Sequence, residues 1–344
     1  MTALLTPAYT LTLGSQRWTQ QVLALELELE LAPRLDALTV RLPAEAPLDA
    51  GLGDDASLEL DGGEGSESAF TGTIAAIERG YREIRVRVLD GGALLAQSRP
   101  ATTYENSSAS RVVSALCGDV NVSTGSLADG PDFAFYAAEP SRSALEHVAR
   151  VCAWGGAIVR FTPSGDLESV VLNATSADLA LRYGRELIAL RQRKAPAPLD
   201  GFVVAGEGGA SSASSPDALR PTTDFFAGSR PDGPGPTSRW AFAPALRTAK
   251  DAATAGAALQ RLYAATRERG TLDAWLLPKL RPGTVIEIHD LPDPMAQGPY
   301  WIESVRHRVT PLGATTRARY VKGGDAFDPS ALIGALAGAL GSLL

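Results

Sequence analysis

Residues 23–31 read LALELELEL, a run in which leucine alternates with alanine or glutamate. A period of two places all the leucines on one face of an extended strand and the carboxylates on the other. On a helix the same leucines would be scattered around the axis, so the alternation outweighs the helix propensity of leucine and glutamate. The stretch therefore predicts a long, half-buried strand that ends at Pro33.

Shorter strand patterns surround this stretch, and Gly-containing turns separate them. They cover residues 37–42, 57–60, 70–77 and 83–89. Short, evenly spaced strands are typical of an antiparallel barrel, so we expect residues 1–98 to form a β-barrel domain. The row Glu26, Glu28 and Glu30 would line one surface with like charge. It is interpreted either as a solvated strand face or as a channel lining that repels unfolded or anionic cargo.

The pattern changes near Pro100, and residues 99–180 are predicted to form a small α/β domain. Apolar spacing predicts helices over 107–117, with Ser107 or Ser108 near the cap, and over 141–154, which Gly155-Gly156 ends. A β-hairpin is predicted to follow, with strands at 157–161 and 167–172.

Strands resume after Leu187, and residues 181–325 are expected to form a second β-barrel domain. Its predicted strands cover 200–205, 272–276, 285–289, 300–309 and 315–321, with a helix over 249–269. Residues 206–238 are rich in Gly, Ser and Pro and are predicted to be a long loop. Residues 326–344 are predicted to be an apolar C-terminal helix or tail. The expected fold class is mainly β with an α+β insertion.

Composition limits the function classes. The 344 residues carry a formal net charge of −7 and no basic stripe along the sequence, so we expect no specific nucleic-acid binding. No stretch has the roughly 20 consecutive apolar residues of a membrane-spanning helix, so no stable membrane insertion is expected. No secretory signal is found, and we expect synthesis in the cytoplasm. Cys117 and Cys152 lie in apolar surroundings and are predicted to be buried free thiols.

The sequence shows no pattern of catalytic, cofactor-binding or metal-binding residues. The glycines of residues 51–56 precede a strand, whereas a dinucleotide-binding loop opens a helix. His147, His289 and His307 are isolated, so ordinary structural roles are expected for them. We therefore predict no enzyme activity, no cofactor and no metal.

The candidate interaction residues are apolar side chains in segments that lack a core of their own. Phe225 and Phe226 are adjacent aromatics in the low-complexity loop, which is expected to order against a neighbouring subunit. In the tail, Asp328 and Pro329 suit the start of a helix. Its apolar stripe, which is expected to order on assembly, includes Leu332, Ile333, Leu336 and Leu340.

Several segments, taken in order, resemble one protein family. They are FTGTI at 70–74, VRVLD at 86–90, EPSRSALEHVA at 139–149, WGGA at 154–157, LRPGTVIEI at 280–288 and GPYWIESVRH at 298–307. Together they are similar to the late control protein D group of contractile phages and to the N-terminal part of VgrG spike proteins. Each segment alone is common in β proteins, whereas their order and spacing are typical of the family.

The resemblance implies a structural baseplate hub of a contractile phage tail or a related injection system. It implies two tail-tube-like barrels per subunit and a homotrimer that adapts the hexameric tail tube to a trimeric spike. The expected partners are a tail tube protein, a separate spike protein and other baseplate proteins, within a virion tail or an extracellular injection particle. Two alternatives are kept: a tail-associated cell-wall hydrolase and a carbohydrate-binding β-protein.

Overall fold

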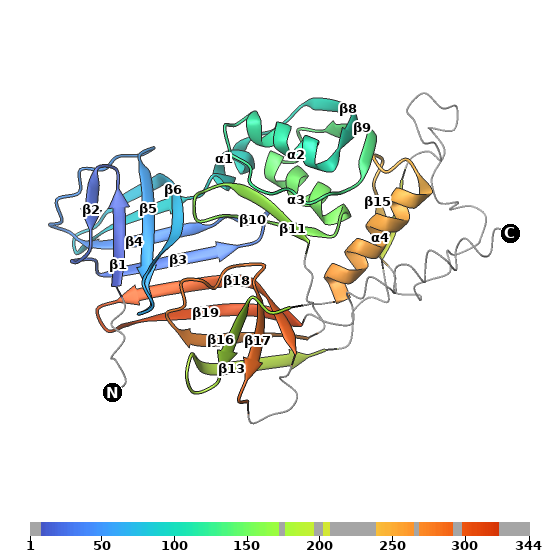
Figure 1. Ribbon diagram of the computed structural model, residues 1–344. Helices are drawn as coiled ribbons and strands as arrows, with labels where there is room; N and C mark the ends of the chain where they lie inside the picture. Colours follow the sequence, from blue (N-terminus) through green and yellow to red (C-terminus); the bar gives the residue numbers. More distant parts are fainter. Residues whose placement is uncertain are drawn as a thin grey trace.

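The computed structural model describes residues 8–171, 176–195, 202–206, 239–264, 268–291 and 298–322. Two β-rich parts lie against each other, and a mixed α/β part packs at one end of them (Figure 1). Strands predominate and the few helices lie in the α/β part. The expected fold class, mainly β with an α+β insertion, is confirmed.

The first β-rich part contains seven strands. They are β1 (Ala8–Leu13), β2 (Gln16–Trp18), β3 (Ala24–Glu30), β4 (Ala37–Pro43), β5 (Asp55–Asp61), β6 (Ser66–Arg79) and β7 (Glu83–Leu89). The alternation in residues 23–31 produces β3, whose leucines are buried while its glutamates stay partly exposed. Leu23 lies just before the strand and is 39% exposed, so the buried stripe is shorter than the sequence run.

The α/β part follows. Its elements are α1 (Gly92–Gln97), β8 (Thr102–Ser108), α2 (Ala109–Gly118), β9 (Asp132–Ala138), α3 (Ala144–Trp154), β10 (Ala157–Phe161) and β11 (Leu167–Val171). The Ser108 side chain caps α2, whereas Ser107 belongs to a strand that the sequence patterns did not predict. Helix α3 begins three residues later than expected because Ser143 and Glu146 form a capping box at its start.

The remaining elements are β12 (Leu179–Arg182), β13 (Leu187–Lys194), β14 (Phe202–Ala205), β15 (Arg239–Phe242), α4 (Ala249–Ala264), β16 (Glu268–Trp275), β17 (Val285–His289), β18 (Pro299–Thr310) and β19 (Gly313–Lys322). The helix expected over 249–269 is too long at its C-terminal end, because Glu268 opens β16. The Glu268 carboxylate contacts Lys194 and Lys322, which lie on β13 and β19. Tertiary pairing therefore outweighs local helix propensity at this position.

One continuous sheet joins the two β-rich parts. Its strand order is β13-β16-β19-β18-β3-β4-β7-β6-β5-β1-β2, with β17 and β12 branching from β18. The parts meet where β18 pairs antiparallel with β3, from Ser304 opposite Glu30 to Val309 opposite Leu25. Closure of either part into a barrel stays a prediction.

The two halves of this sheet repeat the same four-stranded unit. In the order β6-β7-β4-β3 and β18-β19-β16-β13, every pair is antiparallel and the ladders align residue for residue. The leading strand of each unit has a one-residue irregularity at the same position, between Ile74 and Ala76 in β6 and between Ile302 and Ser304 in β18. The equivalent positions carry different residue types, so the repeat is not visible in the sequence.

The repeat assigns equivalent residues. Ile74 lies opposite Val88 as Ile302 lies opposite Tyr320, which makes Glu78 of β6 equivalent to Arg306 of β18. Following the ladders to the far strands makes Arg193 of β13 equivalent to Glu28 of β3.

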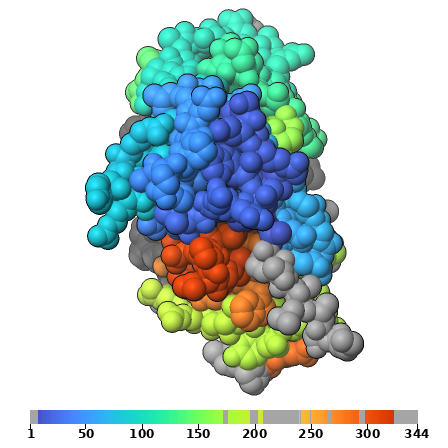
Figure 2. Space-filling view, turned by 90° about the vertical axis from the view of Figure 1, so that its left-hand side faces the viewer, coloured from blue at the N-terminus to red at the C-terminus, as the bar shows by residue number. Residues whose placement is uncertain are grey.

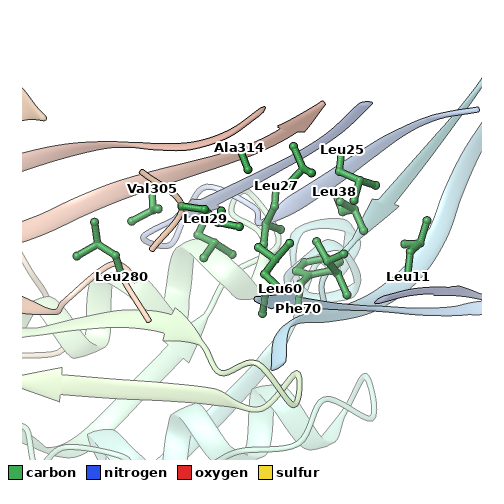
Figure 3. Packing of buried hydrophobic residues seen from close by; sticks show 14 of the residues in the cluster. Leu11, Leu25, Leu27, Leu29, Leu38, Leu60, Phe70, Leu280, Val305 and Ala314 are labelled. Atoms are coloured by element: carbon green, nitrogen blue, oxygen red, sulfur yellow. The ribbon is translucent and has the colours of Figure 1, made fainter. Parts of the chain in front are cut away.

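One large hydrophobic core extends under both β-rich parts. Leu25, Leu27 and Leu29 of β3 pack in one cluster with residues of the neighbouring strands and with Leu280 (Figure 3). Val305 and Ala314 bring β18 and β19 into the same cluster. Each fully buried leucine contributes about 1.5–3 kcal/mol relative to an exposed one.

A second core fills the α/β part, and it extends beyond the predicted limits of that part. It includes Val204 of β14, Leu246 just before α4, and Ala255 of α4. These residues pack with Val148 and Trp154 of α3. Strands β14 and β15 and helix α4 therefore pack with the α/β part, although the sequence patterns placed them in the second β-rich domain. The predicted outer domain limits, at 98, 180 and 325, stay predictions.

Candidate assembly surfaces

The glutamate row of β3 is paired with arginines. Arg306 of β18 contacts Glu26 at 3.1 Å and also Glu28, and Arg319 of β19 contacts Glu30 at 2.9 Å. These side chains are 25–51% exposed, so each pair contributes only about 0–1 kcal/mol. The prediction that this row gives a surface of like charge is therefore wrong, because arginines of the neighbouring half of the sheet pair with the glutamates.

Arginines are prominent over this whole face of the sheet. Register places the following arginines on the face of the glutamate row: Arg41, Arg85, Arg87, Arg191, Arg193, Arg269, Arg306, Arg308, Arg317 and Arg319. They outnumber the carboxylates of the same face, although the chain as a whole is negative. Each strand contributes only a few of them at alternate positions, so the sequence shows no basic run.

Two strand edges at opposite ends of the sheet face are open. β13 pairs with β16 through residues 189–194, and β6 pairs with β7 through residues 76–79. In the part of the chain that the structure describes, no strand pairs with the other edge of either segment. Glu78 and Arg193 are exposed on these edges. Open edges offer unpaired backbone groups to another chain.

A partly buried arginine connects all three parts of the molecule. Arg281, between β16 and β17, donates to the carbonyl of Ala69 in β6 at 2.7 Å and to that of Phe161 in β10 at 3.1 Å. Ala69 is the extra residue of an irregularity between β5 and β6, where Leu58 faces Phe70 and Glu59 faces Ser68. Its carbonyl therefore lies outside the regular ladder, and Arg281 satisfies it. Nearby, Arg160 of β10 donates to the Pro282 carbonyl at 2.8 Å.

Two carboxyl groups are buried next to this joint. Asp36 accepts from the Glu30 amide at 2.7 Å, and the Asp36 amide donates to Asp90 at 3.4 Å. Burial raises the pKa of Asp36 to about 7, against the opposing effects of the Glu30 hydrogen bond and of Arg281. Burial and the negative charge of Asp36 raise the pKa of Asp90 to about 8. Both carboxyl groups therefore hold protons to a higher pH than ordinary aspartates do, and the pair belongs to the packing of the joint.

The histidines have structural contacts. His147 is buried between the Tyr136 hydroxyl, at 2.6 Å from Nδ1, and the Glu139 carbonyl, at 3.0 Å from Nε2. His307 is buried beside Thr316 at 2.9 Å, and burial lowers its pKa to about 3, so the ring is neutral. Over the described ranges, no group of three or more His, Cys, Asp or Glu side chains is placed to hold a metal ion.

Cys117 and Cys152 are free and buried, as predicted. Burial raises the pKa of Cys117 to about 12 and that of Cys152 to about 11, so both stay as unreactive thiols. No helix among the described residues is long and apolar enough to cross a bilayer.

The candidate residues singled out from sequence all lie outside the described residues. These are Phe225, Phe226, Leu332, Ile333, Leu336 and Leu340. The structure indicates other candidate residues: Arg281, where the three parts meet, and Glu78 and Arg193 on the open edges of β6 and β13. Their roles depend on strands that are distant in sequence, so no local pattern indicates them.

One protein-family profile matches most of the chain. The profile of the family described as phage tail baseplate hub (GPD) matches residues 27–312. No curated protein sequence matches the chain.

Solved structures share the fold at low sequence identity. The 43 kDa tail protein of prophage MuSo2 from Shewanella oneidensis has a TM-score of 0.67 at 15% identity, over 92% of this chain and 98% of that one. The tail protein from Neisseria meningitidis MC58 has a TM-score of 0.68 at 12% identity, over 92% and 97% of the two chains. The E. coli c3393 protein, a component of the type VI secretion system, has a TM-score of 0.64 at 11% identity, over 92% and 78%.

Proposed function

Because the chain belongs to the phage tail baseplate hub family and is a structural hub, we propose that three copies form a ring that joins a tail tube to a separate spike. The ring is incorporated into the tail of a virion or of an injection particle, and it acts without catalysis. Other baseplate proteins bind around it. The shifted pKa values of Asp36, Asp90 and His307 fit a role without catalysis, because all three groups are buried in the protein interior rather than in an open site.

The repeated sheet unit is the observation that carries the ring. Within one chain, the leading strand of one unit (β18) pairs with the last strand of the other (β3). The equivalent strands that lack such a partner in the described chain are β6 and β13. We infer that β6 of one copy pairs with β13 of the next copy in the same register. Because this contact joins two different surfaces, it closes into a ring when the rotation per copy is suitable.

Charge supports this register. Inside the chain, Arg306 of β18 lies opposite Glu28 of β3 and the two form an ion pair. At the equivalent position between copies, Glu78 of β6 would lie opposite Arg193 of β13. The signs are exchanged and still complementary, so charge favours this register. With two units per chain, three copies give six equivalent units, the number that a hexameric tube requires.

Charge reversal tests this contact. Glu78→Arg and Arg193→Glu should each weaken trimerisation by at least about tenfold, since like charges meet across the interface. The double variant should recover most of the loss. Mass measured by light scattering, with and without the spike, reports the outcome, and Glu105→Arg is the matched control on an exposed strand position away from both edges. Wild-type trimerisation in both single variants would contradict the proposed interface.

Contacts outside the β6–β13 interface and the two alternative functions need separate tests. We propose that the loop at 206–238, with Phe225 and Phe226, and the tail, with Leu332 and Leu336, bind neighbouring subunits or the spike. A hydrolase would release muropeptides from cell walls, and a carbohydrate-binding protein would bind glycans as a monomer. Either result for the purified chain would replace the hub proposal.

A further inference from the structure

The two equivalent hairpins of the sheet end in exposed apolar side chains. Tyr81 lies in the turn between β6 and β7 and is 98% exposed, and Leu312 lies in the turn between β18 and β19 and is 99% exposed. Turns are usually formed by polar residues and glycine, because an apolar side chain there gains nothing from the fold. The same feature occurs at the tip of both units, which suggests a common partner.

Both tips lie at the same end of the sheet. Register places the end of β18 beside the start of β3, and the end of β4 beside the start of β7. Figure 2 views the molecule from this end: the β6–β7 hairpin (cyan) projects from the surface, and the β18–β19 turn (red-orange) lies at its centre. The α/β part contacts the opposite end, through Arg281 and Phe161. The tips are therefore free of the α/β part of their own chain.

More apolar groups are exposed at this end. Leu23 precedes β3, Ile188 lies at the start of β13 and Trp275 lies at the end of β16, where it faces Thr315 near the β18–β19 turn. Their exposed fractions are 39%, 43% and 60%. Clusters of exposed apolar side chains mark sites of protein association.

A pocket opens beside one of the tips. It has a volume of about 460 Å³ and lies between the β18–β19 turn and residues 19–22. Tyr9, Val22, Leu25 and Val309 give it an apolar lining next to Leu312. A projecting tip next to an apolar pocket gives a surface that a partner can match in shape. Such shape complementarity is typical of specific protein interfaces.

Unpaired arginines lie beside both tips, whereas the two glutamates that flank the β6–β7 turn are paired with other arginines. Arg79 and Arg82 flank Tyr81, and Arg308 lies shortly before Leu312. All three are exposed, and none forms an ion pair with another residue in the described ranges. Charge complementarity therefore favours a partner surface with carboxylates around an apolar centre.

We propose that this end of the hub is the face that receives the first ring of the tail tube, with Tyr81 and Leu312 as the anchors of its two sheet units. The inference rests on the proposed trimer, in which two tips per chain provide six anchor points for a ring of six subunits. The tube subunit would present an apolar pocket with an acidic rim to each tip. The spike binds at the other end, where the α/β part lies.

The test uses the full-length hub with its spike and purified tube subunits. Tyr81→Ser/Leu312→Ser should form at least about tenfold fewer tubes per hub than the wild type, counted by electron microscopy, because both anchors are lost. Leu52→Ser/Leu94→Ser is the matched control, since these leucines are 69% and 50% exposed but lie away from the two tips. The control should nucleate tubes at the wild-type level.

Separate readouts distinguish this inference from the proposed ring. The mass of the hub–spike complex should be unchanged in the Tyr81/Leu312 variant, which shows that ring formation does not need the tips. Wild-type tube nucleation by that variant overturns the assignment, and so does loss of spike capture with nucleation intact. A wild-type hub that stays monomeric with its spike would instead overturn the ring itself.

Discussion

Replacement of Arg281 by methionine tests whether one side chain holds the three parts of the hub together. Methionine keeps much of the apolar volume of the arginine stem but cannot donate a hydrogen bond. The change leaves the carbonyls of Ala69 and Phe161 without their donor at 2.7 and 3.1 Å. It also removes the positive charge of Arg281, which lowers the pKa of Asp36 against the effect of burial.

The magnitude follows from these contacts. A hydrogen bond from a charged donor contributes about 1.5–3 kcal/mol, so the loss of two predicts a decrease of about 3–6 kcal/mol in the free energy of unfolding. Partial relaxation of the joint favours the lower end, about 3 kcal/mol.

Chemical denaturation followed by tryptophan fluorescence measures this loss, because Trp154 lies in the core of the α/β part and Trp301 in the second β-rich part. Arg317→Met is the matched control: Arg317 pairs with Asp273 at 2.6 Å but is 64% exposed. The control should lose less than about 1 kcal/mol. Equal losses in the two variants, or a loss below about 1 kcal/mol for Arg281→Met, would refute a joint held by Arg281.

Three further predictions concern stability and assembly. The raised pKa values of Asp36 and Asp90 mean that the folded state holds protons that the unfolded state has lost, so stability falls as pH rises from about 4 to about 8. Asp90→Asn should therefore flatten this decrease, and pH-dependent thermal unfolding that shows the wild-type slope would contradict it. Leu27→Ala, at a side chain only 1% exposed, should cost about 2–5 kcal/mol in denaturation, whereas Leu23→Ala should cost well under about 1 kcal/mol. Truncation after Phe327 should leave the circular dichroism spectrum intact and weaken trimerisation or spike capture, and undiminished capture would show that the tail has no such role.

The local elements were accessible from the sequence. The alternation at residues 23–31 predicted β3, and the caps Ser108 and Ser143 lie within two residues of the predicted helix starts. Each of these depends on neighbouring residues, because a period or a cap needs only a few positions of the same chain segment. The order of the segments was also sufficient to suggest the hub family.

Relations between distant segments were decided only by the tertiary structure. Arg306 and Glu28 are 278 positions apart in sequence, and neither the repeat of the sheet unit nor the neutralised glutamate row is visible until β18 pairs with β3. The end of α4 and the packing of β14 on the α/β core likewise depend on partners far along the chain. Alternation determines which face of a strand is buried, whereas the neighbour of each strand depends on long-range packing that no local period encodes.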